Sequence, residues 1–270
     1  MTLSAPSRTA LGVAVHRAVH QVLEGGHIFA DPFAKSILGP DSEGLIAERS
    51  TQRHRHMRSF VAVRSRFAQD FLAQAVARGV RQVVVLGAGL DTTALRNPNA
   101  AVFEVDHPVT QDWKRERIAG MNPPAGLRFV PVDFEQQNLA DGLALAGFDL
   151  AAPAFFVWLG VVPYLTRSAI HATLDFAASV PGSEIVFDYS QAPERYPPKQ
   201  RKLVMALVER VAALGEPFRS YFDPPEVTAL LKSKGFGRIE DLGPREIGAR
   251  YLNRRIQTGR AGGHVVWARR

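Results

Sequence analysis

The chain has 270 residues, of which 46% are apolar, enough for one large α/β domain with a sizeable core. It contains no cysteine, which excludes disulfides, thiolate metal sites and a cysteine nucleophile. The net charge of +7 gives a surface potential that favours anionic partners. Since no stretch is apolar enough to span a bilayer and residues 1–12 do not resemble a signal peptide, we expect a cytoplasmic protein that does not enter the membrane.

The opening third of the chain is predicted to be helical. Apolar residues at helical spacing predict helices over residues 8–24 and 60–77. Ser7 is placed as the N-cap of the first helix, and Asp31, followed by proline, as the cap of a short helix between the two. We expect residues 1–80 to form a helical cap that precedes the core.

A basic stretch runs from Arg49 to Arg66, with six arginines, two histidines and no acid. It could bind nucleic acid, but no aromatic interleaving or nucleic-acid motif accompanies it. A solvated helix face with one or two arginines turned inward is favoured, and an inward guanidinium could hold a carboxylate. His54 and His56 do not converge on a metal without further ligands, so we predict no metal site.

From residue 81 onward, predicted strands and helices alternate, which is typical of a doubly wound α/β sheet. The last two strands have no helical periodicity between them, which predicts an antiparallel pair at the sheet edge. We therefore expect one domain, residues 1–270, with a seven-stranded and mostly parallel sheet. The predicted strands are residues 83–87, 102–106, 127–134, 154–160, 184–190, 237–242 and 262–269; the parts after the cap are the core (81–190), an insertion (191–222) and the end of the core (223–270).

The most informative stretch is the run VVVLGAGLDTTALR, residues 83–96, followed by VFEVDHP. It reads as a strand, a tight glycine turn, a helix and a second strand that ends on Asp106. This layout is typical of a cradle for a ribose-bearing cofactor. Gly87 and Gly89 let the backbone approach a ligand, and Asp106 can accept hydrogen bonds from two sugar hydroxyls.

The turn favours S-adenosylmethionine over a dinucleotide. The third glycine of the dinucleotide fingerprint is replaced by Thr92, and Asp91 lies where a pyrophosphate would dock on a helix N-terminus. A carboxylate there opposes two phosphates but tolerates a sulfonium and an ammonium. A dehydrogenase remains an alternative at this point, as does a glycine turn that binds nothing.

Further candidate residues follow the later strands, where the ligand of a doubly wound sheet binds. Asp133 could accept the adenine amine or cap the following helix, and Phe134 could pack on the adenine ring. Tyr164 and Asp188 are placed on the substrate side, where either could orient a nucleophile. His107, followed by proline, is predicted to form a turn rather than a general base. Because the sequence offers no evident His–acid pair, an acceptor that is already anionic, such as a carboxylate, is favoured.

Several segments together resemble the leucine carboxyl methyltransferase family, and more closely its bacterial branch of S-adenosylmethionine-dependent enzymes linked to polyketide or other secondary metabolism. The resemblance covers nearly the whole chain and rests on SRTALGVAVHRA, DPFA, QVVVLGAGLDTTALR, VFEVDHPVTQDWKRERI, FVPVDFE, PYLT and PGSEIVFDY. It implies the class I methyltransferase fold, with the N-terminal helices and the insertion after the fifth strand acting as a lid.

The resemblance also implies where the cofactor is held. It places the methionine carboxylate on Arg64, with Arg17 as a second candidate, and the other contacts on Gly87, Asp106, Asp133 and Phe134. One departure stands out, because Leu159 occupies a position where several family members carry a glutamate that contacts the cofactor.

The sequence thus predicts an O-methyltransferase that acts on a carboxylate or hydroxyl of a small, anionic metabolite. Two other functions remain. One is an RNA methyltransferase that uses the basic stretch, and the other is a non-catalytic module that binds S-adenosylmethionine, for which Leu159 is the only indication.

Overall fold

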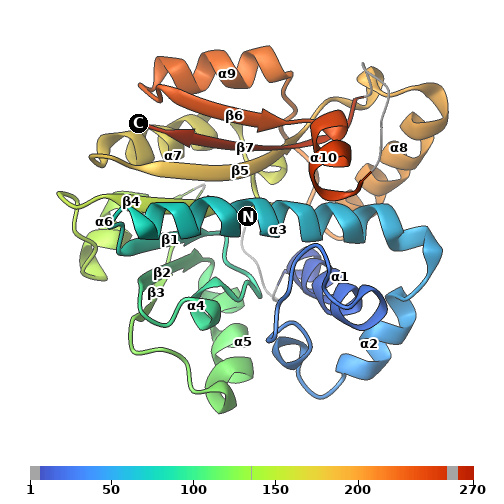
Figure 1. Ribbon diagram of the computed structural model, residues 1–270, viewed down its shortest axis with the longest axis horizontal. Helices are drawn as coiled ribbons and strands as arrows, with labels where there is room; N and C mark the ends of the chain where they lie inside the picture. The colour runs from blue at the N-terminus through green and yellow to red at the C-terminus, as the bar shows by residue number, and fades with distance from the viewer. Residues whose placement is uncertain (1–6, 135, 254–260) are drawn as a thin grey trace.

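Seven strands form one sheet in the order β3-β2-β1-β4-β5-β7-β6, within the residues that the computed structural model describes, 7–134, 136–253 and 261–270 (Figure 1). Every strand runs parallel to the others except β7, which is antiparallel to both of its neighbours. The predicted seven-stranded, mostly parallel, doubly wound sheet is confirmed. The strands are β1 (Gln82–Leu86), β2 (Ala101–Asp106), β3 (Leu127–Pro131), β4 (Ala154–Trp158), β5 (Glu184–Ser190), β6 (Arg238–Leu242) and β7 (Gly263–Arg269).

Helices cover both faces of this sheet, because its central strands are apolar on both sides. In β1, Val83 and Val85 join a core beneath α3 (Arg55–Ala77). Val84 and Leu86 point to the opposite face, into a core with α6 (Leu139–Leu145), α7 (Arg167–Ser179) and α9 (Pro224–Ser233). The remaining core helices are α4 (Thr93–Arg96) and α5 (Pro108–Ile118).

The link between β6 and β7 differs from the prediction. The two strands are antiparallel as expected, but α10 (Pro244–Tyr251) lies between them. Its signals are local: a proline in the first turn, and Ile247 and Tyr251 four residues apart on one face. Four of its eight residues are proline, arginine or glycine, and the sequence beside them is rich in turn-forming residues, so the short helical period was not recognised.

The N-terminal cap consists of α1 (Arg8–Glu24), α2 (Ser42–Arg49) and the first half of α3. Ser7 caps α1 as predicted, since its side chain accepts from the Ala10 amide. The short helix expected after Asp31 is wrong: turns follow Asp31, and the segment reaches only a 3-10 helix at Ser36–Leu38. Asp31 Oδ1 still accepts a hydrogen bond from the Phe33 amide at 3.0 Å, but Asp31 Oδ2 accepts one from Thr92.

The carboxyl ends of the parallel strands meet at one edge of the sheet, and the cap lies beyond that edge. Figure 1 shows α1 and α2 on one side of the first half of α3 and α8 (Pro198–Ala213) on the other. The end of the insertion returns to the core, where Ser220 donates to the Leu165 carbonyl at 2.6 Å. Cap and insertion therefore flank the edge where a doubly wound sheet binds its ligand.

Candidate cofactor and substrate site

The glycine turn is tied to the end of β2. Gly87 and Gly89 have φ angles of +64° and +45°, a region that other residues avoid. The Gly87 amide donates to the Val105 carbonyl at 2.8 Å, and the Gly89 amide donates to Asp106 Oδ2 at 2.5 Å. The turn and the acid, which the sequence placed in one cradle, are thus in direct contact.

Asp106 holds the turn and keeps capacity for a ligand. Its Oδ1 accepts from the His107 amide at 2.7 Å, so each oxygen has one backbone donor. Burial raises the pKa of the Asp106 carboxyl, and the donors from Gly89 and His107 oppose the rise. Because each carboxylate oxygen can accept about two hydrogen bonds, one position per oxygen remains for a ribose hydroxyl.

Neighbouring side chains pack closely over the glycines. A Cβ on Gly87 would lie 2.3 Å from Val161 Cγ2, and one on Gly89 would lie 2.9 Å from the methyl group of Ala10. Val161 comes from the loop after β4, and Ala10 from the first turn of α1. Both segments therefore border the place where the cofactor would cross the turn.

We expect Gly87→Ala to lower the free energy of unfolding by about 1–3 kcal/mol, because it combines a positive φ with steric overlap. Denaturant unfolding measures this change. Gly12→Ala is the matched control, since nothing lies within 4 Å of a Cβ at that helical position. The control should be neutral or stabilising. If Gly87→Ala were as stable as the control, the described packing of Val161 on the turn would be wrong.

The charge of Asp91 is compensated inside the protein. Its Oδ1 accepts from the Thr93 amide at 2.6 Å, at the start of α4. Burial acts to raise the pKa of the Asp91 carboxyl, but the charges of Arg17, Arg96 and Lys114 outweigh it and lower the pKa. Asp91 is therefore not a bare anion facing the ligand. Asp91 therefore repels a pyrophosphate less strongly than its place in the sequence suggests.

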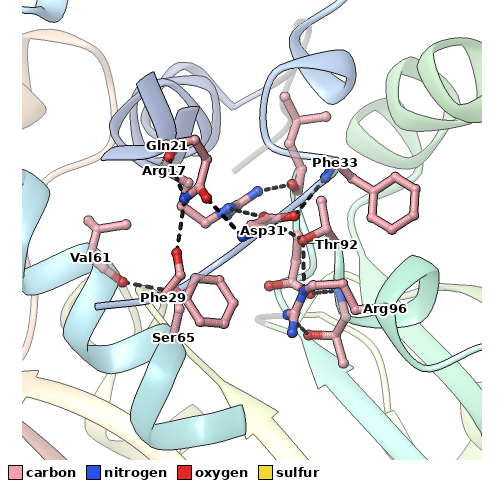
Figure 2. Close-up of polar contacts among 12 residues, drawn as sticks. Arg17, Gln21, Phe29, Asp31, Phe33, Val61, Ser65, Thr92 and Arg96 are labelled. Atoms are coloured by element: carbon pink, nitrogen blue, oxygen red, sulfur yellow. Dashed lines mark hydrogen bonds and ion pairs between the residues drawn. The ribbon is translucent and has the colours of Figure 1, made fainter. Parts of the chain in front are cut away.

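Thr92 has a structural role that explains why it replaces a glycine. Figure 2 shows its hydroxyl donating to Asp31 Oδ2 at 2.8 Å, with Arg17 Nε 3.3 Å from the same oxygen. Arg17 also donates to the Leu90 carbonyl. Asp31 and Arg17 thus fasten α1 to the glycine turn. Asp31 was missed as a contact of the turn, because the dipeptide Asp-Pro looks like an ordinary helix cap.

Lys114 is a second residue that sequence analysis missed. Its ammonium lies 2.6 Å from Glu104 Oε2 on β2 and donates to the Asp91 carbonyl at 2.6 Å. Both side chains of this pair are at most 2% exposed. Lys114 supports the turn through the Asp91 carbonyl, and no sequence pattern distinguishes it from Arg115 and Arg117, the other cations of the same helix.

Arg64 and Asp188 form a buried ion pair at the ends of β4 and β5. Arg64 Nη1 donates to Asp188 Oδ2 at 2.7 Å, and Asp188 Oδ1 accepts from the Gly160 amide at 2.5 Å. The guanidinium lies against Gly160, within 2.6 Å of where its Cβ would be. The predicted cofactor residue Arg64 and the predicted substrate-side residue Asp188 are therefore neighbours.

Tyr164 lies beside this pair, in a 3-10 helix at Val162–Tyr164. Its ring contacts Phe218 of the insertion with centroids 5.0 Å apart. Its hydroxyl is hydrogen bonded to Thr9 at the start of α1. Burial raises the pKa of Tyr164 to about 12, so the phenol is protonated at neutral pH. It can donate a hydrogen bond but cannot take a proton.

The adenine side of the predicted site follows β3. Asp133 accepts a hydrogen bond from the side-chain amide of Gln136 at 2.9 Å. Phe134 packs against the core on the face of the sheet that α6, α7 and α9 cover. The alternative role of Asp133 as the N-cap of α6 is wrong, because Asn138 caps that helix by accepting from the Ala140 amide. The turn predicted at His107 is instead the N-cap of α5, where the ring Nδ1 accepts from the Val109 amide.

Leu159, which replaces the family glutamate, packs against the core beneath α3 and borders a small cavity with Asp91 and Arg96. Its side chain can offer no charge to a cofactor. The next residue, Gly160, donates its amide hydrogen to the Asp188 carboxylate at 2.5 Å.

Among the arginines of the basic stretch whose side chains the structure describes, Arg58 and Arg64 are turned inward and buried, as the sequence favoured. The structure also contains a His–acid pair that the sequence did not reveal. His264 Nδ1 lies 3.0 Å from Asp241 Oδ1, beside a groove of about 660 Å³. The pair sits on β7 and β6, beyond β5 from the glycine turn, and is not part of the cradle.

Within the described ranges, no group of three or more His, Cys, Asp or Glu side chains is arranged to hold a metal ion. Among the helices that the structure describes, none has the length and apolar character needed to cross a membrane.

Comparison with known families decides the relationship. The leucine carboxyl methyltransferase model matches residues 10–178 of this chain. The chain belongs to the leucine carboxyl methyltransferase family. A Bacillus subtilis (strain 168) relative, "Putative S-adenosyl-L-methionine-dependent methyltransferase YktD", is 32% identical over 92% of each chain. A Mycolicibacterium smegmatis relative whose name also carries "S-adenosyl-L-methionine-dependent methyltransferase" is 32% identical over 72% of this chain and 67% of its own.

A solved structure agrees with the fold. A crystal structure from Nostoc punctiforme PCC 73102, described as that of "a putative O-methyltransferase", superposes with a TM-score of 0.52 at 11% identity, covering 98% of this chain and 73% of the other. The predicted membership of the leucine carboxyl methyltransferase family is confirmed. The names of its relatives carry the cofactor that the sequence predicts, S-adenosylmethionine.

Proposed function

We propose that this member of the leucine carboxyl methyltransferase family transfers the methyl group of S-adenosylmethionine to an oxygen of a small, anionic metabolite. The observation that carries the proposal is the contact between the glycine turn and Asp106, with the Arg64–Asp188 pair at the neighbouring strand ends.

The residues present fit the cofactor. Asp106 has one free acceptor position on each oxygen for the ribose hydroxyls. Gly87 and Gly89 have positive φ angles and put no side chain on the turn, and Asp133 and Phe134 follow β3 on the adenine side. When bound, S-adenosylmethionine supplies an electrophilic methyl group on a sulfonium.

Arg64 and Asp188 are suited to the methionine end. The guanidinium can hold a carboxylate by two parallel hydrogen bonds. Asp188 accepts from the Gly160 amide, the residue after Leu159, and so brings an acid to the strand end where family members carry a glutamate. We propose that Asp188 meets the cofactor ammonium there, while Arg64 takes the carboxylate.

The choice of acceptor rests on the lack of a suitable base beside Arg64 and Asp188 among the residues that the structure describes. Tyr164 is protonated at neutral pH because its pKa is raised to about 12. An acceptor carboxylate needs no base, since it is already ionised and attacks the methyl carbon as its bond to sulfur breaks. The contribution of the protein is then to align the two reactants and to exclude water.

The proposal predicts a flat pH profile for methyl transfer. With a panel of small carboxylic acids and phenols and labelled S-adenosylmethionine, kcat/KM for the carboxylate acceptor should change less than about twofold between pH 6.5 and 9, because an acid with pKa near 4 stays ionised. Transfer to phenols alone, with a rate that rises toward pH 10, would contradict a carboxylate acceptor. Failure to methylate any acid or phenol, with the cofactor bound, would favour the non-catalytic module.

A further inference from the structure

His16 lies on the inner side of α1, which packs against α2 and α3. Its ring is buried, with 6% of the residue exposed, and Nδ1 has no hydrogen-bond partner among the described residues. Buried polar atoms without partners are rare in folded proteins and call for a ligand, a water or a redistribution of hydrogen bonds. This nitrogen belongs to no interaction of the cradle.

Arg58, whose charge acts on His16 and whose guanidinium binds the end of α1, has a second such atom. Its Nε and Nη2 hold the Glu24 carboxylate at 2.9 and 2.5 Å, which fastens α3 to the end of α1. The remaining nitrogen, Nη1, is buried and also lacks a partner in the described part of the chain. A charged donor left without an acceptor is more costly than a neutral one.

The surroundings of His16 are cationic. Burial lowers its pKa to about 3, and the charges that act in the same direction are those of Arg49, His54, Arg58 and Arg64. Each of these arginines already has an acid as its partner: Glu48 for Arg49, Asp188 for Arg64, and Glu24 for Arg58, with Glu24 also taking His20. A neutral imidazole among guanidiniums is suited to donate a hydrogen bond to an oxyanion.

We propose that His16 and Arg58 form an anion subsite at the junction of α1, α2 and α3, which binds a carboxylate or phosphate group of the methyl acceptor. The inference rests on the proposed function for the identity of its ligand. It assigns an interior role to the basic stretch, and it makes the cap a specificity element rather than only a cover. Arg64, which bounds the subsite, connects it to the strand ends where the methyl group would be transferred.

The test uses the whole protein saturated with S-adenosylhomocysteine. Inorganic phosphate and, separately, acetate are titrated while the histidine ring signals are followed by NMR, with His16→Gln assigning the His16 signal. We expect a saturable shift of that signal with a Kd on the order of 1–10 mM for at least one anion. The anion that binds more tightly identifies the group on the acceptor.

Variants separate the subsite from general electrostatics. Calorimetric titration should show binding weakened about tenfold in His16→Phe and in Arg58→Lys, since each loses a hydrogen bond to an anion. Arg66→Gln is the matched control: it removes one charge from the same helix, but Arg66 is exposed and pairs with Asp70. The control should bind the anion within about twofold of the wild type.

Three results would overturn the inference. The first is no saturable shift up to about 100 mM anion, far weaker than a built site would bind. The second is equal weakening in Arg66→Gln. The third is anion binding that occurs in the protein alone but is abolished by S-adenosylhomocysteine. The nitrogens of His16 and Arg58 would then bind the cofactor carboxylate. If S-adenosylhomocysteine itself does not bind, the proposed function fails, and anion binding by the protein alone still tests the subsite.

Discussion

Asp106→Ala is expected to weaken S-adenosylhomocysteine binding about 100-fold, because two hydrogen bonds to a charged acceptor are lost at about 1.5 kcal/mol each. The carboxylate also holds the Gly89 amide, so the turn itself loses an anchor. Isothermal titration measures the affinity, and a thermal melt of the same sample shows that the variant is folded.

Asp112→Ala is the matched control for Asp106→Ala. Asp112 lies on the helix that follows β2, its side chain is 71% exposed, and it contacts only Arg115 among the ion pairs of the described chain. Its removal should leave the affinity within about twofold. A loss of less than about threefold in Asp106→Ala would show that Asp106 does not hold the ribose, because even one ordinary hydrogen bond is worth about 1 kcal/mol.

Asp188→Asn should lower the free energy of unfolding by about 3–5 kcal/mol, because it leaves the buried guanidinium of Arg64 without its counter-charge. The side chains of the pair are 8% and 6% exposed, so water offers little compensation. Asparagine keeps an oxygen for the Gly160 amide, and the effect therefore isolates the charge. Urea unfolding monitored by circular dichroism measures the loss.

Two further variants make this result interpretable. Asp70→Asn removes the partner of Arg66 in an exposed pair on the same helix, and should cost less than about 1 kcal/mol. Arg64→Met combined with Asp188→Asn should recover much of the stability, because it removes the stranded charge. If Asp188→Asn lowered the free energy of unfolding no more than Asp70→Asn does, Arg64 and Asp188 would not stabilise the protein as a buried ion pair.

The sheet could be predicted because its signals are local. β-branched runs bounded by glycine or charged residues predicted β1 and β2 within a residue or two of their ends, and Ser7 caps the helix predicted for it. The reversed β7 followed from chain order and turn composition. In each case a few neighbouring residues decide the conformation, and tertiary packing does not override them.

The site could be predicted only in part, because its contacts join distant segments. The pairing of Arg64 with Asp188 spans 124 positions, and that of Thr92 with Asp31 spans 61. The sequence suggested an uncompensated charge at Asp91, because the three cations that offset it, Arg17, Arg96 and Lys114, lie on α1, α4 and α5. Short-range patterns identify which residues are chemically able to act, but only the folded chain shows what each one already contacts.

If the glycine turn and Asp106 form a cradle for S-adenosylmethionine, isothermal titration of the unmodified protein will detect the binding. S-adenosylhomocysteine should bind with one site per chain and a Kd in the range of about 1–100 μM, while NAD should show no heat of binding at about 1 mM. Absence of S-adenosylhomocysteine binding at about 1 mM, or binding of NAD in its place, would show that this cradle does not hold S-adenosylmethionine.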